Sequence, residues 1–169
     1  LKRRITPRTR MLMVSNPHNP TGRVFTRKEL EGIAEIAQEH DLLIFTDELY
    51  EDMLFEGEHV CIASLSPDLF RRTLTVFGFS KAFGIPGYRI AYLVTGGDFV
   101  AALKKRIHDV IVHTDTLAQA AAKAALTTGS PWISKLMAHL KEMRDYGAER
   151  LNRMPGVSCH VPQATPFLF

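Results

Sequence analysis

The stretch LLIFTDELY, residues 42–50, decides the fold. Residues 42–46 are apolar up to Thr46 and show no alternation with polar residues. A strand that is apolar on both faces is typical of a parallel sheet covered by helices on both sides. The acidic pair Asp47-Glu48 follows directly, so polar chemistry begins where the strand ends. This stretch predicts an α/β fold with a mostly parallel sheet and helices on both faces.

Strands and helices alternate on both sides of this stretch. The capping-box pair Thr26 and Glu29 begins a helix, which apolar residues at helical spacing continue to His40. Short apolar runs predict three further strands, the first of them buried, at residues 11–15, 73–79 and 90–94. Only ten residues, 80–89, separate the last two strands, and they include two glycines and a proline. We therefore expect a shaped loop there and not a helical crossover.

The second half of the chain is predicted to be mostly helical. Asp98 can cap a helix that runs to about residue 111, and an Ala-rich helix covers residues 116–128. Ser130 as N-cap and Pro131 at the first helical position begin a third helix, which ends near Arg153. This last helix is long for a globular protein, which predicts a link between two domains.

The C-terminal residues are predicted to be extended. A Pro-Gly pair at residues 155–156 breaks the long helix, and residues 157–161 follow as a predicted strand. The chain finishes on a strand-like apolar run at residues 165–169, and it starts only a few residues before its first strand. From both ends we expect a piece of something longer.

The composition excludes several classes of protein. Hydrophobic residues make up 46% of the chain and charged residues 23%, which excludes disorder. No apolar run approaches the ~18 residues of a membrane-spanning helix, and the basic start has no signal-peptide pattern. A formal net charge of +3 is too small to indicate a nucleic-acid partner. Cys61 and Cys159 lie far apart and the histidines have no metal-ligand spacing, so we expect no metal and a reducing, cytoplasmic setting.

Polar residues follow three of the predicted strands. The loops are NPHNPTG at residues 16–22, DELY at 47–50 and SKAFGIPGYR at 80–89. Ligands bind outside the carboxyl ends of the strands in open α/β sheets, so we expect the three loops to line one site. They offer an amide, a carboxylate, a phenol, an amine and a guanidinium. Such a set suits one polar, anionic, aromatic ligand better than a metal.

These three loops, in this order and at these distances, resemble the signature of the class I and II aminotransferases. These are fold-type I enzymes that use pyridoxal 5′-phosphate (PLP). The sequence around the second loop is most similar to that of aspartate and aromatic aminotransferases. The resemblance covers essentially the whole chain. It implies part of the PLP-binding large domain at residues 1–130, an interdomain helix at 131–153 and the start of a small C-terminal α/β domain at 154–169.

The resemblance implies two residues for the chemistry itself. Lys81 would form the Schiff base with PLP, because only an unprotonated amine attacks the aldehyde, and would then act as general base and acid. Asp47 would pair with the pyridine nitrogen and keep it protonated, so that the ring accepts electrons. Taken singly, a lysine is more often on the surface and an aspartate after a strand is more often a turn former.

The remaining motif residues are implied to hold the cofactor. Asn19 and Tyr50 would bond the phenolic oxygen of the ring, whereas Arg89 would hold the phosphate with help from the Ser80 hydroxyl. Gly87 would let the backbone pass close to the ligand. Each of the three larger residues also has an ordinary structural interpretation. Asn19 could form an Asx-turn, Tyr50 could be a half-buried core residue, and Arg89 could form an ion pair at the start of a strand.

The function that the resemblance implies is transfer of an amino group from an amino acid to a 2-oxo acid. The full-length protein would be a cytoplasmic homodimer in amino acid metabolism, without a nucleic-acid or membrane partner. The phosphate loop, the ring-stacking aromatic and the arginine for the substrate carboxylate have no counterpart in this chain. We therefore expect the 169 residues alone to bind PLP weakly and to show little or no activity.

Three alternatives use the same residues. A PLP-dependent lyase on this fold would need the same lysine and aspartate. An aminotransferase-like effector domain of a transcriptional regulator would bind PLP as a ligand, with a DNA-binding module upstream. A degenerate structural homologue is disfavoured, because all six cofactor positions are filled.

Overall fold

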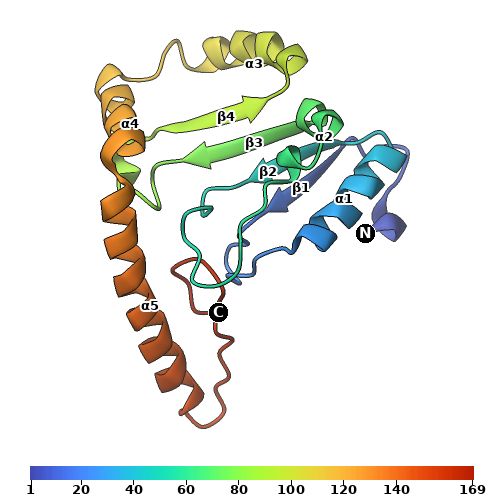
Figure 1. Ribbon diagram of the computed structural model, residues 1–169. Helices are drawn as coiled ribbons and strands as arrows, with labels where there is room; N and C mark the ends of the chain where they lie inside the picture. The colour runs from blue at the N-terminus through green and yellow to red at the C-terminus, as the bar shows by residue number, and fades with distance from the viewer.

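A four-stranded sheet lies at the centre of the computed structural model, which describes residues 1–169 (Figure 1). Its spatial order follows the chain: β1 (Met11–Ser15), β2 (Leu43–Asp47), β3 (Thr73–Gly78) and β4 (Ala91–Thr95). β1, β2 and β3 are parallel, and β4 is antiparallel to β3. The predicted α/β fold with a mostly parallel sheet is thus confirmed, as is the short loop between β3 and β4.

Helices connect and flank these strands. The α-helices are α1 (Arg27–Glu39), α2 (Pro67–Arg72), α3 (Gly97–Val110), α4 (Thr116–Thr128) and α5 (Ser130–Asn152). Single 3-10 turns stand at Lys2–Arg4, Ile62–Ser64 and Pro86–Tyr88. The predicted capping box before α1 is present, with Thr26 and Glu29 bonded to each other's backbone N–H groups. Ser66 caps α2 by a single bond, in which its hydroxyl accepts the N–H of Leu69.

The main core lies between the sheet and α1. Leu12 and Ile44 are register partners on β1 and β2, so they face the same side, where Leu30 and Ala37 of α1 cover them. Ile44 and Ala37 are fully buried. α1 connects the parallel strands β1 and β2. A right-handed crossover of this kind puts its helix on one face of the sheet, and the core forms on that face.

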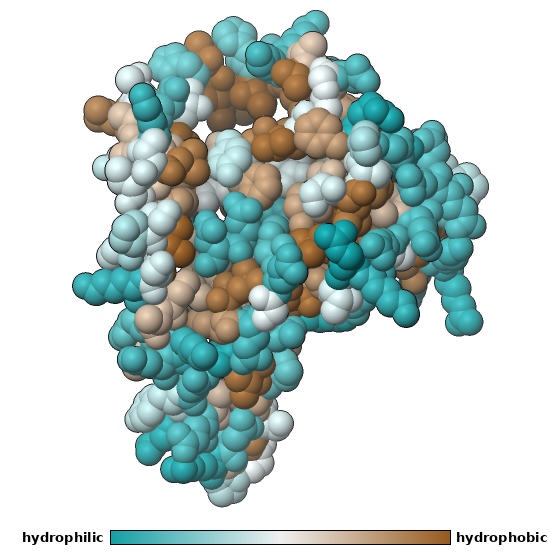
Figure 2. Space-filling model, in the orientation of Figure 1, coloured by the Kyte–Doolittle hydropathy of each residue, from teal (hydrophilic) through white to brown (hydrophobic).

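The opposite face of the sheet is less covered than predicted. Met13 on β1 is 77% exposed, although the sequence predicts a buried strand there. Leu93 on β4 is also exposed, and α3 contributes no buried residue. Figure 2 shows hydrophobic side chains gathered at the surface between β4 and α3. No helix of these 169 residues covers this face over β1, so the second helical layer is absent there.

Three local predictions in the second half are wrong. Asp98 lies inside α3, whose N-cap is Gly96, and Ser130 is the first residue of α5, whose N-cap is Gly129. Each helix therefore begins earlier than its polar residue suggests. Residues 157–161 form no strand, because no neighbouring strand offers them backbone partners, and Val157 is 43% exposed.

The C-terminal residues instead return along α5 to the loops of the sheet (Figure 1). The N–H of Ala164 donates to the carbonyl of Gly22 at 2.9 Å, and the N–H of Thr165 to that of Met53 at 3.0 Å. Buried Arg144 of α5 donates to the Pro162 carbonyl at 2.9 Å and forms ion pairs with Glu56 and Asp145. These contacts hold residues 162–165 against the loops that follow β1 and β2.

A buried acid secures the end of β2. Glu48 is 1% exposed, and both of its carboxylate oxygens are bonded, one by the Thr46 hydroxyl and the other by Nε2 of His59. Burial acts to lower the pKa of His59, but the hydrogen bond and the charge of Glu48 outweigh it, and the pKa lies above its usual 6.5. His59 therefore supplies the positive charge that a buried carboxylate requires.

We expect the substitution Gly22→Ala to destabilise the fold more than Gly57→Ala. Both glycines have a left-handed backbone, with φ of +66° and +81°, so each alanine costs about 1–2 kcal/mol of strain. At Gly22 an added Cβ would also stand 2.3 Å from Cβ of Pro162, whereas Gly57 has open space. That overlap adds about 1–3 kcal/mol. Urea unfolding measures both variants, and equal losses would contradict the packing argument.

We also expect the contribution of His59 to stability to depend on pH. Because folding raises its pKa, the bond to Glu48 contributes fully below pH 6.5 and is lost as the pH rises through the raised value. The difference in free energy of unfolding between the unmodified chain and His59→Gln should therefore shrink as the pH rises. The exposed His139 of α5 offers a control, His139→Gln, which should show no such trend. A difference independent of pH would exclude the charged pair.

Candidate functional site

Three of the predicted residues meet at the carboxyl edge of the sheet. Nδ2 of Asn19, from the loop after β1, donates to Oη of Tyr50, from the loop after β2, at 3.3 Å. Nζ of Lys81, from the loop after β3, lies 5.8 Å from the centre of the Tyr50 ring. The parallel strands deliver these loops to one edge, as predicted. An amide, a phenol and an amine are therefore side by side.

Tyr50 is the fixed member of this group. Its side chain is buried with Met53 and Ala82 in a second, smaller core cluster. The ring of Phe167 meets the Tyr50 ring edge-on, with centroids 5.9 Å apart and an interplanar angle of 73°. Such a T-shaped pair holds the ring plane, so the phenolic oxygen keeps its direction toward Asn19.

Asp47 ends β2 and faces the open side of the sheet. Side chains alternate along a strand, so Asp47 shares its face with Phe45 and not with the buried Thr46. Its Oδ1 accepts the N–H of Leu49 at 3.1 Å, which is the turn-forming role, whereas Oδ2 makes no hydrogen bond. The Asp47 carboxylate therefore forms the turn with one oxygen and keeps the other oxygen free as an acceptor.

The structure does not join Ser80 and Arg89 to this group. Arg89 is exposed, its backbone is left-handed with φ of +50°, and its guanidinium donates to the Pro86 carbonyl at 2.8 Å. Ser80 is half-buried and makes no side-chain hydrogen bond. A Cβ on Gly87 would meet no atom within 4 Å, so packing within this chain does not require a glycine there. The roles of these three residues stay predictions.

Acidic residues surround the turn after Tyr50. Burial, followed by the charge of Asp52, raises the pKa of Glu51 to about 7. Burial likewise raises the pKa of Asp52 and of the Tyr92 hydroxyl, the latter with help from Glu51. Glu51 is thus partly protonated near neutral pH, which limits the negative charge beside the site.

Sequence reasoning missed two contacts of this region. It finds only that the histidines have no metal-ligand spacing, whereas His59 pairs with Glu48 next to Asp47. It assigns nothing to Trp132, whose indole N–H donates to the carbonyl of Ala82 at 3.1 Å. No local pattern marks either partner, because the pairs are 11 and 50 residues apart.

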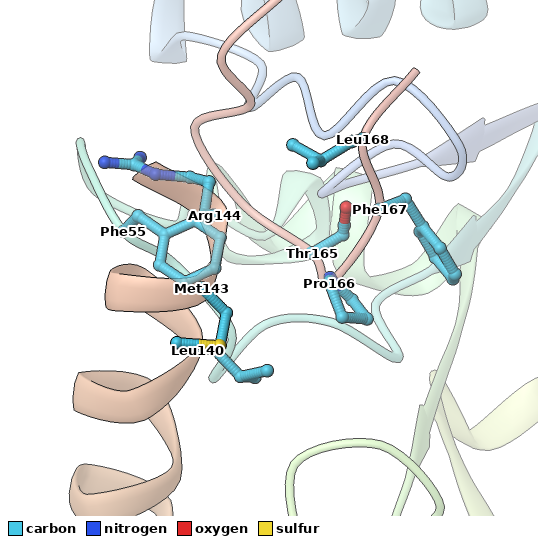
Figure 3. A pocket seen from close by; sticks show the side chains of 8 residues that line it. All are labelled: Phe55, Leu140, Met143, Arg144, Thr165, Pro166, Phe167 and Leu168. Carbon is cyan, nitrogen blue, oxygen red and sulfur yellow. The ribbon is translucent and has the colours of Figure 1, made fainter. Parts of the chain in front are cut away.

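A small, half-open pocket lies between α5 and the C-terminal segment, beside Tyr50 and not among the polar groups of the site. Its volume is about 90 Å³, and Figure 3 shows the side chains of α5 and of the C-terminal segment that surround it. The lining is mostly apolar and includes Phe167, whose ring also contacts Tyr50. With Arg144 as its one charged group, it is a packing gap rather than a place for a polar cofactor.

The donors and acceptors at the sheet edge fit PLP. The amine of Lys81 is half-buried and forms no ion pair, so it is free to bond an aldehyde. Oδ2 of Asp47 is a free acceptor for a protonated ring nitrogen, and Asn19 and Tyr50 present N–H and O–H groups to an anionic ring oxygen. The chemistry of the set matches each polar part of the pyridine ring.

Comparisons with known proteins agree with this chemistry. An aspartate aminotransferase from Musicola paradisiaca (strain Ech703) is 37% identical over 98% of the chain, which corresponds to 41% of that protein. The crystal structure of an aromatic aminotransferase from Pyrococcus horikoshii OT3 superposes with a TM-score of 0.91 at 34% identity, over 97% of the chain and 44% of that protein. A PLP-bound protein from Clostridium difficile 630 gives 0.88 at 26% identity, over 94% and 42%.

The match extends over every residue of the chain. The chain spans about two fifths of the length of the curated relatives it matches, 41% in the Musicola protein. A profile of the family described as aminotransferase class I and II matches residues 1–169. The chain therefore belongs to the aminotransferase class I and II family.

Proposed function

We propose that the protein containing this chain is a PLP-dependent aminotransferase. It would transfer an amino group from an amino acid to a 2-oxo acid. The observation that carries the proposal is the meeting of Lys81, Tyr50 and Asn19 at the edge where Asp47 ends β2. Membership of the family and the names of the relatives support the same reaction. Nothing in the chain favours a lyase or a regulator over it.

Six residues would hold the cofactor. Lys81 would bond it through its amine, Asp47 would face the ring nitrogen, and Asn19 and Tyr50 the phenolic oxygen. Ser80 and Arg89 would bind the phosphate, and the guanidinium of Arg89 has donors left for it beside the one that it gives to the Pro86 carbonyl. When bound, PLP supplies an electron sink that stabilises negative charge on the α-carbon of an amino acid.

The residues of the chain would then move protons and orient the ring. The free amine of Lys81 can take the proton from the α-carbon and return it, as a general base and acid. Tyr50, held by Phe167, would orient the ring through its phenolic oxygen, and Asn19 would share that contact. Asp47, whose Oδ1 accepts the Leu49 N–H, would direct its free Oδ2 toward the ring nitrogen.

The remaining expectations are part of the same proposal. Residues 1–130 would belong to the large domain, 131–153 to an interdomain helix and 154–169 to the start of the small domain. The protein would act as a homodimer in amino acid metabolism in the cytoplasm. No helix of the chain has both the length and the apolar character needed to cross a membrane. The named relatives act on different amino acids, so the donor is left to a screen of half-reactions.

We expect Lys81→Ala in the full-length protein to lose the covalent bond to PLP and to lower the transamination rate by about 100- to 10,000-fold. Borohydride reduction followed by peptide mass mapping should place PLP on Lys81 of the unmodified protein. Lys123→Ala, an exposed lysine on α4, serves as the control and should leave label and rate unchanged. A label on another lysine would contradict the proposed role.

We expect Asp47→Ala to retain part of the PLP binding and to lower the rate by about 100- to 1000-fold, because it removes the charge that keeps the ring nitrogen protonated. Equilibrium dialysis measures the binding, and single-turnover kinetics with an amino acid measure the rate. Glu35→Ala, at an exposed position on α1, controls for the loss of one acid. A variant that binds weakly yet turns over at the normal rate would overturn the assignment.

A further inference from the structure

The loop that carries Lys81 is held by contacts with α4 and α5, which lie outside the sheet. Residues 81–84 form a turn, in which the N–H of Gly84 donates to the carbonyl of Lys81 at 3.2 Å. The junction of α4 and α5 lies against this loop (Figure 1). The indole N–H of Trp132, in the first turn of α5, donates to the carbonyl of Ala82 at 3.1 Å. Lys81 therefore sits one residue from an anchored peptide group.

The bond from Trp132 is the only hydrogen bond that the Ala82 carbonyl accepts. Ala82 is 3% exposed, so its backbone oxygen needs a partner inside the protein. No backbone N–H reaches it, and the indole is a donor without acceptor capacity. Without Trp132, the peptide group between Ala82 and Phe83 would have to turn toward another donor or toward water.

Two close contacts add to the anchor. Atoms of the Trp132 ring lie 3.5 to 4.0 Å from the place where a Cβ of Gly84 would stand, and Gly84 has a left-handed φ of +65°. A Cβ on Gly129 would lie 2.6 Å from the ring of Phe83, so that ring rests on the bare backbone between α4 and α5. The junction thus contacts residues 82, 83 and 84, the whole turn behind the lysine.

We propose that Trp132 is a positioning residue for Lys81, acting through the carbonyl of Ala82. The inference rests on the proposed function of Lys81 as the residue that bonds PLP. Trp132 orients the backbone of the lysine turn, and with it the direction of the amine over the Tyr50 ring. It touches neither PLP nor substrate in this role. The indole also joins the first turn of α5 to the lysine.

The test compares two variants of the full-length, PLP-loaded protein. Trp132→Phe keeps an aromatic ring against Gly84 but removes the N–H donor. Tyr146→Phe removes one polar atom from another exposed aromatic of α5 and serves as the matched control. The readouts are the pH midpoint of the absorbance of lysine-linked PLP, kcat and KM for the amino acid, and the melting temperature.

We expect Trp132→Phe to shift the absorbance midpoint and to lower kcat by about two- to tenfold, as the loss of one hydrogen bond allows, with KM unchanged. Tyr146→Phe should change none of these. A wild-type midpoint and kcat in Trp132→Phe would overturn the proposal, and a lowered melting temperature alone would show a merely structural role. If Trp132→Phe does not fold, a benzothienylalanine at position 132, with sulfur in place of N–H, replaces it and is judged by the same readouts.

Hydrogen exchange in the cofactor-free protein separates this inference from the proposed function. Loss of the Trp132 bond in Trp132→Phe should speed amide exchange in the peptide that contains residues 81–84. The C-terminal half of α5 should show no change. Unchanged exchange in residues 81–84 would overturn the inference. Absence of lysine-linked absorbance in the unmodified protein would instead overturn the proposed function and leave the exchange result to decide on Trp132.

Discussion

The parallel register of β1, β2 and β3 is the constraint on which the rest depends. Because these strands run in one direction, the chain must leave each of them at the same edge of the sheet. Asn19, Tyr50 and Lys81, which are far apart in the sequence, follow three successive strands and therefore meet there. The core that fixes the register is a cluster of nine buried residues, to which β1 contributes Leu12 and β2 contributes Ile44, both under α1. A slip by one residue would turn Asp47 from the open face to the covered face.

The end of β2 shows how one short segment serves both packing and chemistry. Thr46 and Glu48 point into the covered side, where they bond each other and His59. Asp47, between them, points to the open side and keeps one oxygen free. The period of two along a strand separates the two tasks, so the burial of Glu48 fixes the backbone that presents Asp47.

Sequence patterns predicted what depends on neighbouring residues. The strands, the capping box of α1 and the loops that end the strands were all visible, since apolar runs, caps and turn residues act over a few positions. The predicted strand at 157–161 failed because a strand needs a partner that no local pattern reveals. His59 and Trp132 were missed for the same reason, as each finds its partner across the fold. The exposure of Met13 depends on which elements cover that face of the sheet, and the residues of a strand do not indicate this.

Helix α5 and the segment that follows it contact the site at two points. Its first turn holds the lysine loop through Trp132, and the segment after its last turn returns to place Phe167 on Tyr50. Between these points Arg144 ties the helix to Pro162 and Glu56. The sheet therefore fixes Asp47 alone, whereas the amine and the phenol are set jointly by the sheet and by α5. The geometry of the site is therefore a property of the helix and the sheet together.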